Sequence, residues 1–179
     1  MANKKRVDIP ENLGRPSEID YSSAAMDFGP LDRDRVPIRT MTEGDLMAIV
    51  AIDRRITGRD RAGYLGQKLD EALNQTDIRV SLVADIDGTA AGFIMARVDL
   101  GEFGRLEPAA VLDTLGVDPG FRDRGVGRAL MSQLFANLSS LRIDKVLTEV
   151  DWKERGLIAF LAECDFRPST RLAFEYRPR

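Results

Sequence analysis

Two glycines and three arginines lie together in the middle of this sequence, between two segments of different hydrophobic period. The segment at residues 111–117 is short and mostly apolar and ends in Asp118-Pro119-Gly120, and apolar residues at helical spacing begin after Gly125. This order predicts a strand at 111–117, a loop, and a helix at 125–138. The first N–H groups of such a helix have no partner within it, and the helix dipole adds partial positive charge there. The loop is therefore a candidate binding site for a phosphate-bearing ligand.

The charge and the glycines of this loop support that interpretation. The loop contains three arginines and one acidic residue, Asp123, so its net charge is +2, whereas the net charge of the chain is −3. Gly125 and Gly127 have no Cβ, so a ligand can approach the backbone closely. The arginines are Arg122, Arg124 and Arg128.

Two common phosphate-binding motifs do not fit the loop. A P-loop requires a Lys-Ser or Lys-Thr pair after its glycines, and none follows here. The dinucleotide-binding fingerprint requires a third glycine where this chain has Leu130. What fits is Arg122-x-x-Gly125-x-Gly127 after a Val-Asp-Pro sequence at 117–119. This pattern resembles the acetyl-CoA loop of the GCN5-related N-acetyltransferase (GNAT) family.

The resemblance implies roles for the residues around the loop. In this family two parallel strands splay apart, and the pantetheine of acetyl-CoA lies in the slot and pairs with the backbone of the first strand. Here that backbone is at residues 115–117, and the loop at 122–129 would hold the pyrophosphate. The cofactor-binding residues implied are Leu115, Gly116, Val117, Arg122, Asp123, Arg124, Gly125, Val126, Gly127, Arg128 and Ala129. No metal is implied.

The hydrophobic pattern along the chain predicts an α/β fold with a mixed sheet. Strands are predicted at 36–40, 78–86, 90–100, 111–117, 145–150 and 171–176, and helices at 46–57, from 60 to about 73, at 125–138 and at 154–164. Asp87-Gly88 predicts a hairpin turn. Because a helix connects the strands at 111–117 and 145–150, we expect these two to be parallel. The family resemblance covers residues 36–176 and implies a central, mostly antiparallel sheet with one splayed parallel pair, flanked by helices.

The chain divides into two parts by its pattern. Residues 1–35 show no clear period and contain several prolines and glycines, so we expect an N-terminal arm that packs on the domain or contacts a partner. Residues 36–179 form the predicted acetyltransferase domain. Many relatives are dimers, and the resemblance therefore implies a homodimer.

Composition excludes several kinds of chemistry and location. The chain has no histidine, which removes every Ser-His, Cys-His and His-metal arrangement, and no metal-ligand cluster is evident. A single cysteine fits a reducing cytoplasm, and no apolar run approaches the length of a membrane span. The mildly acidic balance argues against nucleic-acid binding. The predicted partners are therefore acetyl-CoA and an amine acceptor, with no membrane and no nucleic acid.

Two carboxylates are candidates for the general base. Glu149 matches the glutamate of the fifth strand in many relatives, where it acts through water, and Asp113 lies on the predicted fourth strand. Each is also consistent with a solvated or salt-bridged carboxylate. The family often places an asparagine and a tyrosine in the following helix, and this chain has Glu154 and Leu161 there. The tyrosine that would protonate the leaving thiolate is therefore missing.

Three functions are consistent with these residues. The first is an acetyl-CoA-dependent N-acetyltransferase acting on a primary amine, which is a protein N-terminus, a lysine or a small molecule. The second is a non-catalytic acyl-CoA-binding regulatory domain, which the missing tyrosine favours. The third is a nucleotide-binding α/β domain. Four arginines around the turn at 57–60 form a basic rim that would suit an acidic acceptor and is equally consistent with solvated surface.

Overall fold

The structure is a computed structural model that describes residues 36–74, 78–99, 107–170 and 175–178. In chain order the strands are β1 (Ile38–Thr40), β2 (Arg79–Ile86), β3 (Thr89–Asp99), β4 (Ala109–Val117) and β5 (Val146–Leu147). The helices are α1 (Leu46–Thr57), α2 (Ala62–Asn74), α3 (Val126–Ser140) and α4 (Arg155–Glu163), with short 3-10 turns at Glu43–Asp45 and Pro119–Phe121. Each helix begins and ends within about two residues of its predicted bounds.

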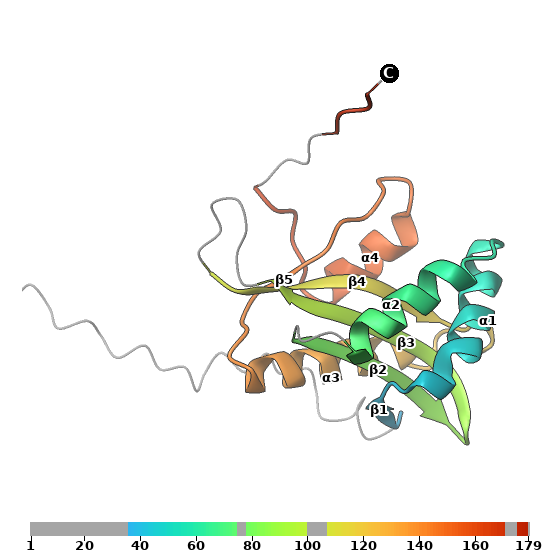
Figure 1. Ribbon diagram of the computed structural model, residues 1–179. Coiled ribbons are helices and arrows are strands. Elements are labelled where there is room, and N and C mark those ends of the chain that lie inside the picture. The colour runs from blue at the N-terminus through green and yellow to red at the C-terminus, as the bar shows by residue number, and fades with distance from the viewer. Residues whose placement is uncertain (1–35, 75–77, 100–106, 171–174, 179) are drawn as a thin grey trace, which may run out of the picture.

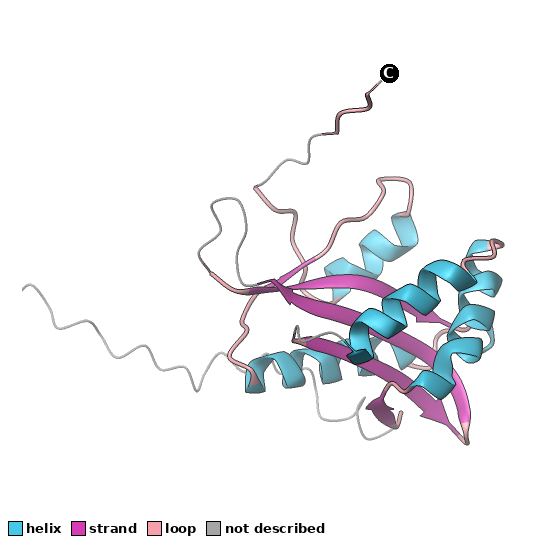
Figure 2. Ribbon diagram, viewed as in Figure 1, coloured by secondary structure: helices cyan, strands magenta, loops and turns pink. Residues whose placement is uncertain are grey.

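The five strands form one sheet in the order β1-β2-β3-β4-β5 (Figures 1 and 2). The first four are antiparallel neighbours, and β5 pairs with β4 in parallel. Helices α1 and α2 cover one face of the sheet, and α3 and α4 lie on the other. The predicted fold class, a mixed sheet with one parallel pair flanked by helices, is confirmed.

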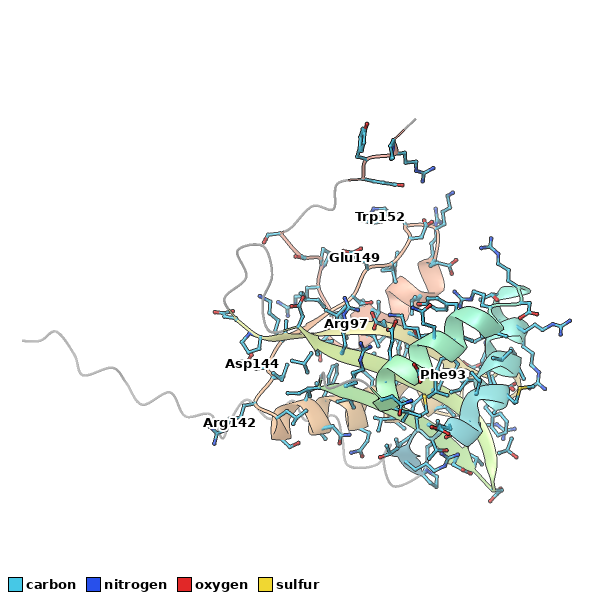
Figure 3. All side chains as sticks on the ribbon, viewed as in Figure 1. Phe93, Arg97, Arg142, Asp144, Glu149 and Trp152 are labelled. Carbon is cyan, nitrogen blue, oxygen red and sulfur yellow. The ribbon has the colours of Figure 1, made fainter. Side chains whose placement is uncertain are left out.

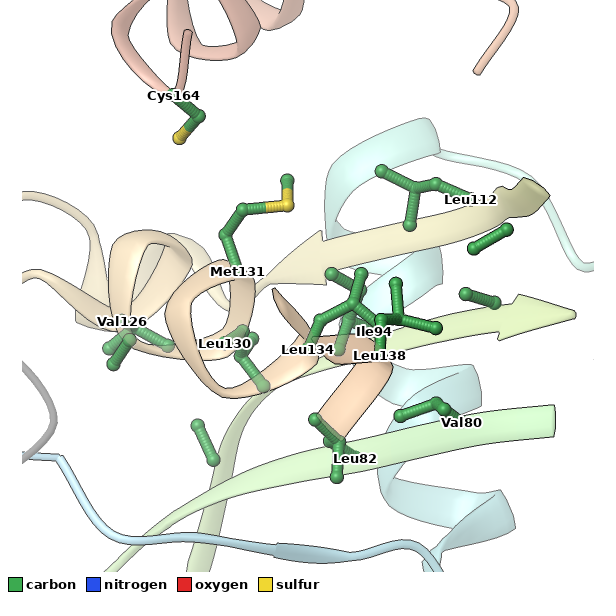
Figure 4. Close-up of a cluster of buried hydrophobic side chains, with 14 of the residues drawn as sticks. Val80, Leu82, Ile94, Leu112, Val126, Leu130, Met131, Leu134, Leu138 and Cys164 are labelled. Carbon is green, nitrogen blue, oxygen red and sulfur yellow. The ribbon is translucent and has the colours of Figure 1, made fainter. Parts of the chain in front are cut away.

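The larger core lies between α3 and the sheet (Figure 4). Helix α3 buries at least one side chain in every turn. Alternate residues of the central strands face it, because successive strand side chains point to opposite faces. Six of the α3 residues are nearly inaccessible to solvent: Val126, Ala129, Leu130, Met131, Leu134 and Leu138. On β3, Ile94 joins this core while Phe93 packs on the opposite face with α1 and α2.

The hairpin between β2 and β3 turns where the sequence predicts. Asp87 and Gly88 have φ angles of 52° and 77°, the left-handed pair that a two-residue type I′ turn requires. A short polar residue and a glycine adopt these angles most readily, which explains why this dipeptide signals the turn.

The fifth strand is much shorter than predicted. Residues 145–150 were expected to form a strand, but only Val146 and Leu147 pair with β4. The next residue, Thr148, contacts β4 through its side chain, and its hydroxyl lies 3.1 Å from the carbonyl oxygen of Leu112. The predicted arm at 1–35 and most of the predicted strand at 171–176 lie outside the described residues, and Glu175 and Tyr176 are not in a strand.

A buried carboxylate ties the first strand to the first helix. Asp45 accepts two hydrogen bonds from the Arg39 guanidinium, at 2.8 and 2.7 Å, and one from the backbone N–H of Thr42 at 2.7 Å. Arg39 also donates to Asp85 on β2. These hydrogen bonds, chiefly those from Arg39, lower the pKa of Asp45 to about 2.

We expect Asp45→Asn to lower the free energy of unfolding by about 2 kcal/mol at pH 7, because the shift in the pKa of Asp45 is a difference in stability. A lowered pKa stabilises the fold above the unfolded-state pKa of about 4, and this stabilisation is lost as pH falls toward 2. Urea unfolding at pH 7 and pH 3 measures both effects, and the variant should lose less stability between them than the wild type. Asp144→Asn, at an exposed carboxylate on the surface, is the matched control. An equal pH dependence in Asp45→Asn and wild type would contradict this assignment.

Candidate active site

The two parallel strands part soon after they meet. Among the described residues, β5 pairs only with Ala110 and Val111 of β4. The backbone N–H of Asp118 donates to Ala91 of β3, and hydrogen-bonding direction alternates along a strand. The backbone groups of Val117 and Leu115 therefore point to the other edge of β4, which β5 has left. Both are residues for which the sequence predicts backbone contacts to a ligand.

Asp113 occupies a β-bulge where the strands part. Met95 of β3 faces Thr114 and Ala96 faces Leu112, so Asp113 is the extra residue on β4. Bulges re-aim side chains and are frequent beside active sites. Asp113 points to the face covered by α2, where it forms ion pairs with Arg97 and, at 3.4 Å, with Lys68. Its side chain is 13% exposed.

Glu149 differs from Asp113 in its surroundings. It lies one residue beyond the hydrogen bond between Thr148 and Leu112, on the segment that has left β4 (Figure 3). The side chain is exposed and forms no ion pair with another described residue. The structure thus places the two predicted carboxylates on either side of the point where the strands part, one held by two cations and the other open to water.

The loop after β4 has the geometry expected of an anion site. Asp123 and Gly125 adopt left-handed φ angles of 59° and 77°, and α3 begins at Val126. Gly125 is the N-cap of α3 and has no side chain to cap it, so the N–H groups of Val126 and Gly127 have no side-chain partner there. Arg122 and Arg124 are exposed, and Arg124 lies over the Phe121 ring at 5.3 Å. Arg128 forms an ion pair with Glu163 of α4 at 3.1 Å.

An ion pair fixes the start of this loop to α1. Asp118 is buried, accepts a hydrogen bond from the N–H of Gly120 at 2.8 Å and contacts the Arg55 guanidinium. The Val-Asp-Pro sequence therefore forms a turn whose carboxylate also anchors a helix 63 residues earlier. The sequence predicts the turn, but nothing in it selects Arg55 as the partner.

Helix α4 packs against the start of α3. A Cβ added at Gly127 would lie 3.1 Å from the Phe160 ring and 3.7 Å from Val117, so three elements meet at this glycine. Sequence reasoning missed Phe160 because it stands one residue before the position compared with the family tyrosine. That position, Leu161, is buried in the core. Asp165, just after α4, takes a left-handed φ of 63°.

A comparison with protein families identifies the chain. Residues 48–166 match the model of the acetyltransferase (GNAT) family, and the chain therefore belongs to this family. The predicted family and the prediction of an acetyltransferase are confirmed. Comparison with curated proteins gives no match.

Solved structures share the fold at low sequence identity. The aminoglycoside acetyltransferase AAC(6')-Iy, in complex with a bisubstrate analogue of CoA, is 20% identical over 80% of this chain and 98% of its own, with a TM-score of 0.68. AAC(6')-Ih from Acinetobacter baumannii is 17% identical over 80% and 99%, with a TM-score of 0.68. A transcriptional regulator from Bacillus halodurans C-125 is 16% identical over 79% and 99%, with a TM-score of 0.65. Enzymes and a regulator thus share this fold, and the fold alone does not decide between them.

Two further observations concern metal binding and membrane spanning. No group of three or more His, Cys, Asp or Glu side chains in the described part of the chain is placed to hold a metal ion. In the same ranges, none of the helices has the length and apolar character needed to cross a membrane.

We expect Gly116→Ala to destabilise the fold by about 1–3 kcal/mol, the usual effect of overpacking. A Cβ at this position of β4 would lie 2.6 Å from the ring of Phe93, which is 1% exposed. Chemical denaturation measures the loss, and Phe93→Leu in the same chain should recover part of it. Gly66→Ala is the control, because its Cβ would meet nothing closer than 3.9 Å. Equal stability of Gly116→Ala and wild type would contradict the close contact.

Proposed function

We propose that this chain transfers the acetyl group of acetyl-CoA to a primary amine. The observation that carries the proposal is the open edge of β4 at Leu115 and Val117, which leads directly into the basic loop and the uncapped start of α3. A strand edge with free backbone groups suits an extended amide-bearing chain such as pantetheine. A helix N-terminus with arginines beside it suits a pyrophosphate.

In this proposal the backbone of residues 115–117 binds the pantetheine and the loop at 122–129 binds the pyrophosphate. Gly125 and Gly127 have no Cβ and leave the backbone accessible. A larger residue is disfavoured at Gly125 by its left-handed φ and at Gly127 by the neighbouring Phe160 ring. Arg122 and Arg124 are exposed at the loop surface, where they can neutralise phosphate charge.

The chemical difficulty in this reaction is the proton on the acceptor. A lysine-like amine has a pKa of about 10.4, so neutralising it at pH 7 costs roughly 4.6 kcal/mol, whereas an α-amine with a pKa of about 7.8 costs about 1.1 kcal/mol. The neutral nitrogen attacks the thioester carbonyl, the C–N bond forms, and the C–S bond breaks as the nitrogen loses its proton. The products are the N-acetylated amine and the CoA thiol.

Glu149 is the general base in this proposal, acting through a water molecule. Its exposed carboxylate has lone pairs free to accept a proton from water. The carboxylate oxygens of Asp113 are occupied by Arg97 and Lys68, which suits a positioning role better than proton transfer. Leu161, at the position of the missing tyrosine, is buried, so the departing thiolate takes its proton from water.

The alternative is a non-catalytic acyl-CoA-binding domain. It is favoured by the missing tyrosine and by the regulator that shares the fold. Release of CoA thiol that depends on added amine distinguishes the two, because a binding domain would bind CoA without releasing thiol.

The proposal extends to the location and assembly of the protein. A reducing cytoplasm suits the one cysteine, Cys164, which is buried and whose pKa burial raises to about 11. A homodimer is proposed on the family resemblance, and light scattering of the purified full chain tests it.

We expect Gly127→Glu to abolish CoA binding, because it places bulk and negative charge where the phosphates would lie. Gly127→Gln is the matched control, since it adds the same bulk without the charge and meets the same Phe160 ring. Titration calorimetry with CoA should show a loss of more than about tenfold in affinity for the Glu variant relative to the Gln variant. Wild-type affinity in both variants would remove the loop from the site.

We expect Glu149→Gln to lower kcat by about 100-fold at pH 7, a typical contribution of a general base, with little change in CoA affinity. The acid limb of the pH profile of kcat/KM should flatten, because the amide cannot titrate. The control is Asp144→Asn, at an exposed carboxylate just before β5. An unchanged pH profile in Glu149→Gln would exclude Glu149 from proton transfer.

A further inference from the structure

The proposed site has unlike charges on its two sides. On the sheet side, Arg97 and Lys68 both form ion pairs with Asp113, so two cations share this one carboxylate, and Lys68 also lies 3.8 Å from Glu71. On the other side, Glu149 and Asp151 are exposed on the segment that follows β5. A ligand at the parting of the strands therefore meets cations on one side and carboxylates on the other.

The two sides are adjacent because one hydrogen bond joins them. The Thr148 hydroxyl lies 3.1 Å from the carbonyl oxygen of Leu112. Asp113 follows Leu112 on β4. Glu149 follows Thr148 on the diverging segment (Figure 3). The cations that hold Asp113 are thus near the place where an amine would approach Glu149.

The cations on the sheet side retain hydrogen-bonding capacity. Arg97 contacts Asp113 through one terminal nitrogen of its guanidinium and is 39% exposed, whereas Asp113 beneath it is 13% exposed. The Lys68 ammonium reaches its carboxylates only at 3.4 Å from Asp113 and 3.8 Å from Glu71. A guanidinium has five donors, and an ammonium has three, so both can bind a further anion.

From this arrangement we propose that the acceptor carries an anionic group, a carboxylate or a phosphate, beside its amine, and that Arg97 and Lys68 bind that group. The inference rests on the proposed function and adds the chemical class of the acceptor. The amine of such a molecule lies toward Glu149, and its anionic group lies on the sheet side. Charge-assisted hydrogen bonds from Arg97 then orient the acceptor as well as attract it.

The end of α1 adds positive charge to the same face. Ile56 lies against Gly116, so the last turn of α1 covers the end of β4. Arg54 and Arg59, at this turn, are exposed and form no ion pair with another described residue. A polycationic acceptor would bring its remaining ammonium groups against these side chains and Arg97. We therefore expect aminoglycosides to be poor acceptors for this chain, although enzymes that acetylate them share its fold.

The test compares acceptors of different charge, and the glutamate and glutamine peptides form a nearly isosteric pair. The full chain is supplied with acetyl-CoA and one of three dipeptide amides, alanyl-glutamate, alanyl-glutamine or alanyl-lysine, and CoA thiol release gives kcat/KM. Phosphoethanolamine is added to separate a phosphate from a carboxylate preference, and sisomicin serves as the polycation. We expect kcat/KM for the glutamate peptide or for phosphoethanolamine to exceed that for the glutamine peptide by about tenfold. For the lysine peptide and for sisomicin, kcat/KM should be lower than for the glutamine peptide.

A second set of measurements tests whether Arg97 causes the preference for anionic acceptors. Arg97→Gln should reduce the anionic-to-neutral ratio of kcat/KM to about 1–2, and Arg97→Lys should retain most of it, because the charge is kept. Arg142→Gln, which removes the same charge at an exposed site away from the parting strands, should leave the ratio unchanged (Figure 3). A purely structural role for Arg97 would alter stability or kcat without changing this ratio.

The outcomes separate the inference from the proposed function. Turnover with a preference for neutral or cationic amines, or a ratio unaffected by Arg97→Gln, would overturn the anionic acceptor and leave the transferase intact. Calorimetric binding of CoA with no thiol release from any of these amines would overturn both and favour the binding domain. An anionic preference that Arg97→Gln abolishes supports the inference.

Discussion

The site depends on the early parting of β4 and β5. Unpaired backbone N–H and C=O groups at a strand edge need partners, and a sheet normally supplies them from the next strand. Here the next strand leaves after two residue pairs, and no other strand in the described ranges pairs with the edge of β4 from Asp113 to Val117, which lies beside a basic loop. The bulge at Asp113 falls at the same place, so the strand bends and twists where its partner departs. The fold thus leaves a short length of open strand edge that ends at a helix N-terminus.

That open edge is kept in place by contacts on the side away from it. Phe93 fills the space beneath Gly116, and Arg55 binds Asp118 at the end of the strand. Both contacts lie on the face of β4 that α1 covers. The edge can therefore stay unpaired without collapsing, because β4 is already fixed by β3 on one side and by α1 on one face. Burial of the Asp118 carboxylate makes this ion pair more effective than an exposed one, since water screens it less.

The sequence predicted the parts of this arrangement that are local. The i, i+4 spacing from Val126 to Leu138 and the Asp87-Gly88 turn specify their structures within a few residues, and both agree with the structure. The predicted length of β5 was wrong. This length depends on whether β4 continues to pair with the strand, and the sequence of residues 148–150 does not determine that pairing by itself. The cations around Asp113 were missed for a similar reason. Lys68 lies 45 residues before Asp113 and Arg97 lies 16 residues before it, and only the folded sheet brings them together.

The pairing of Asp113 with two cations bears directly on which carboxylate does the chemistry. A general base must have a lone pair within reach of the proton and must not lose strong hydrogen bonds when it takes that proton. Protonating Asp113 would weaken its contacts with Arg97 and Lys68 and leave two cations close together around a neutral acid. Protonating Glu149 breaks no ion pair among the described residues, since its carboxylate faces water. The same cations that disfavour Asp113 as a base give the site its attraction for an anion, so the choice of base and the proposed choice of acceptor follow from one cluster of charges.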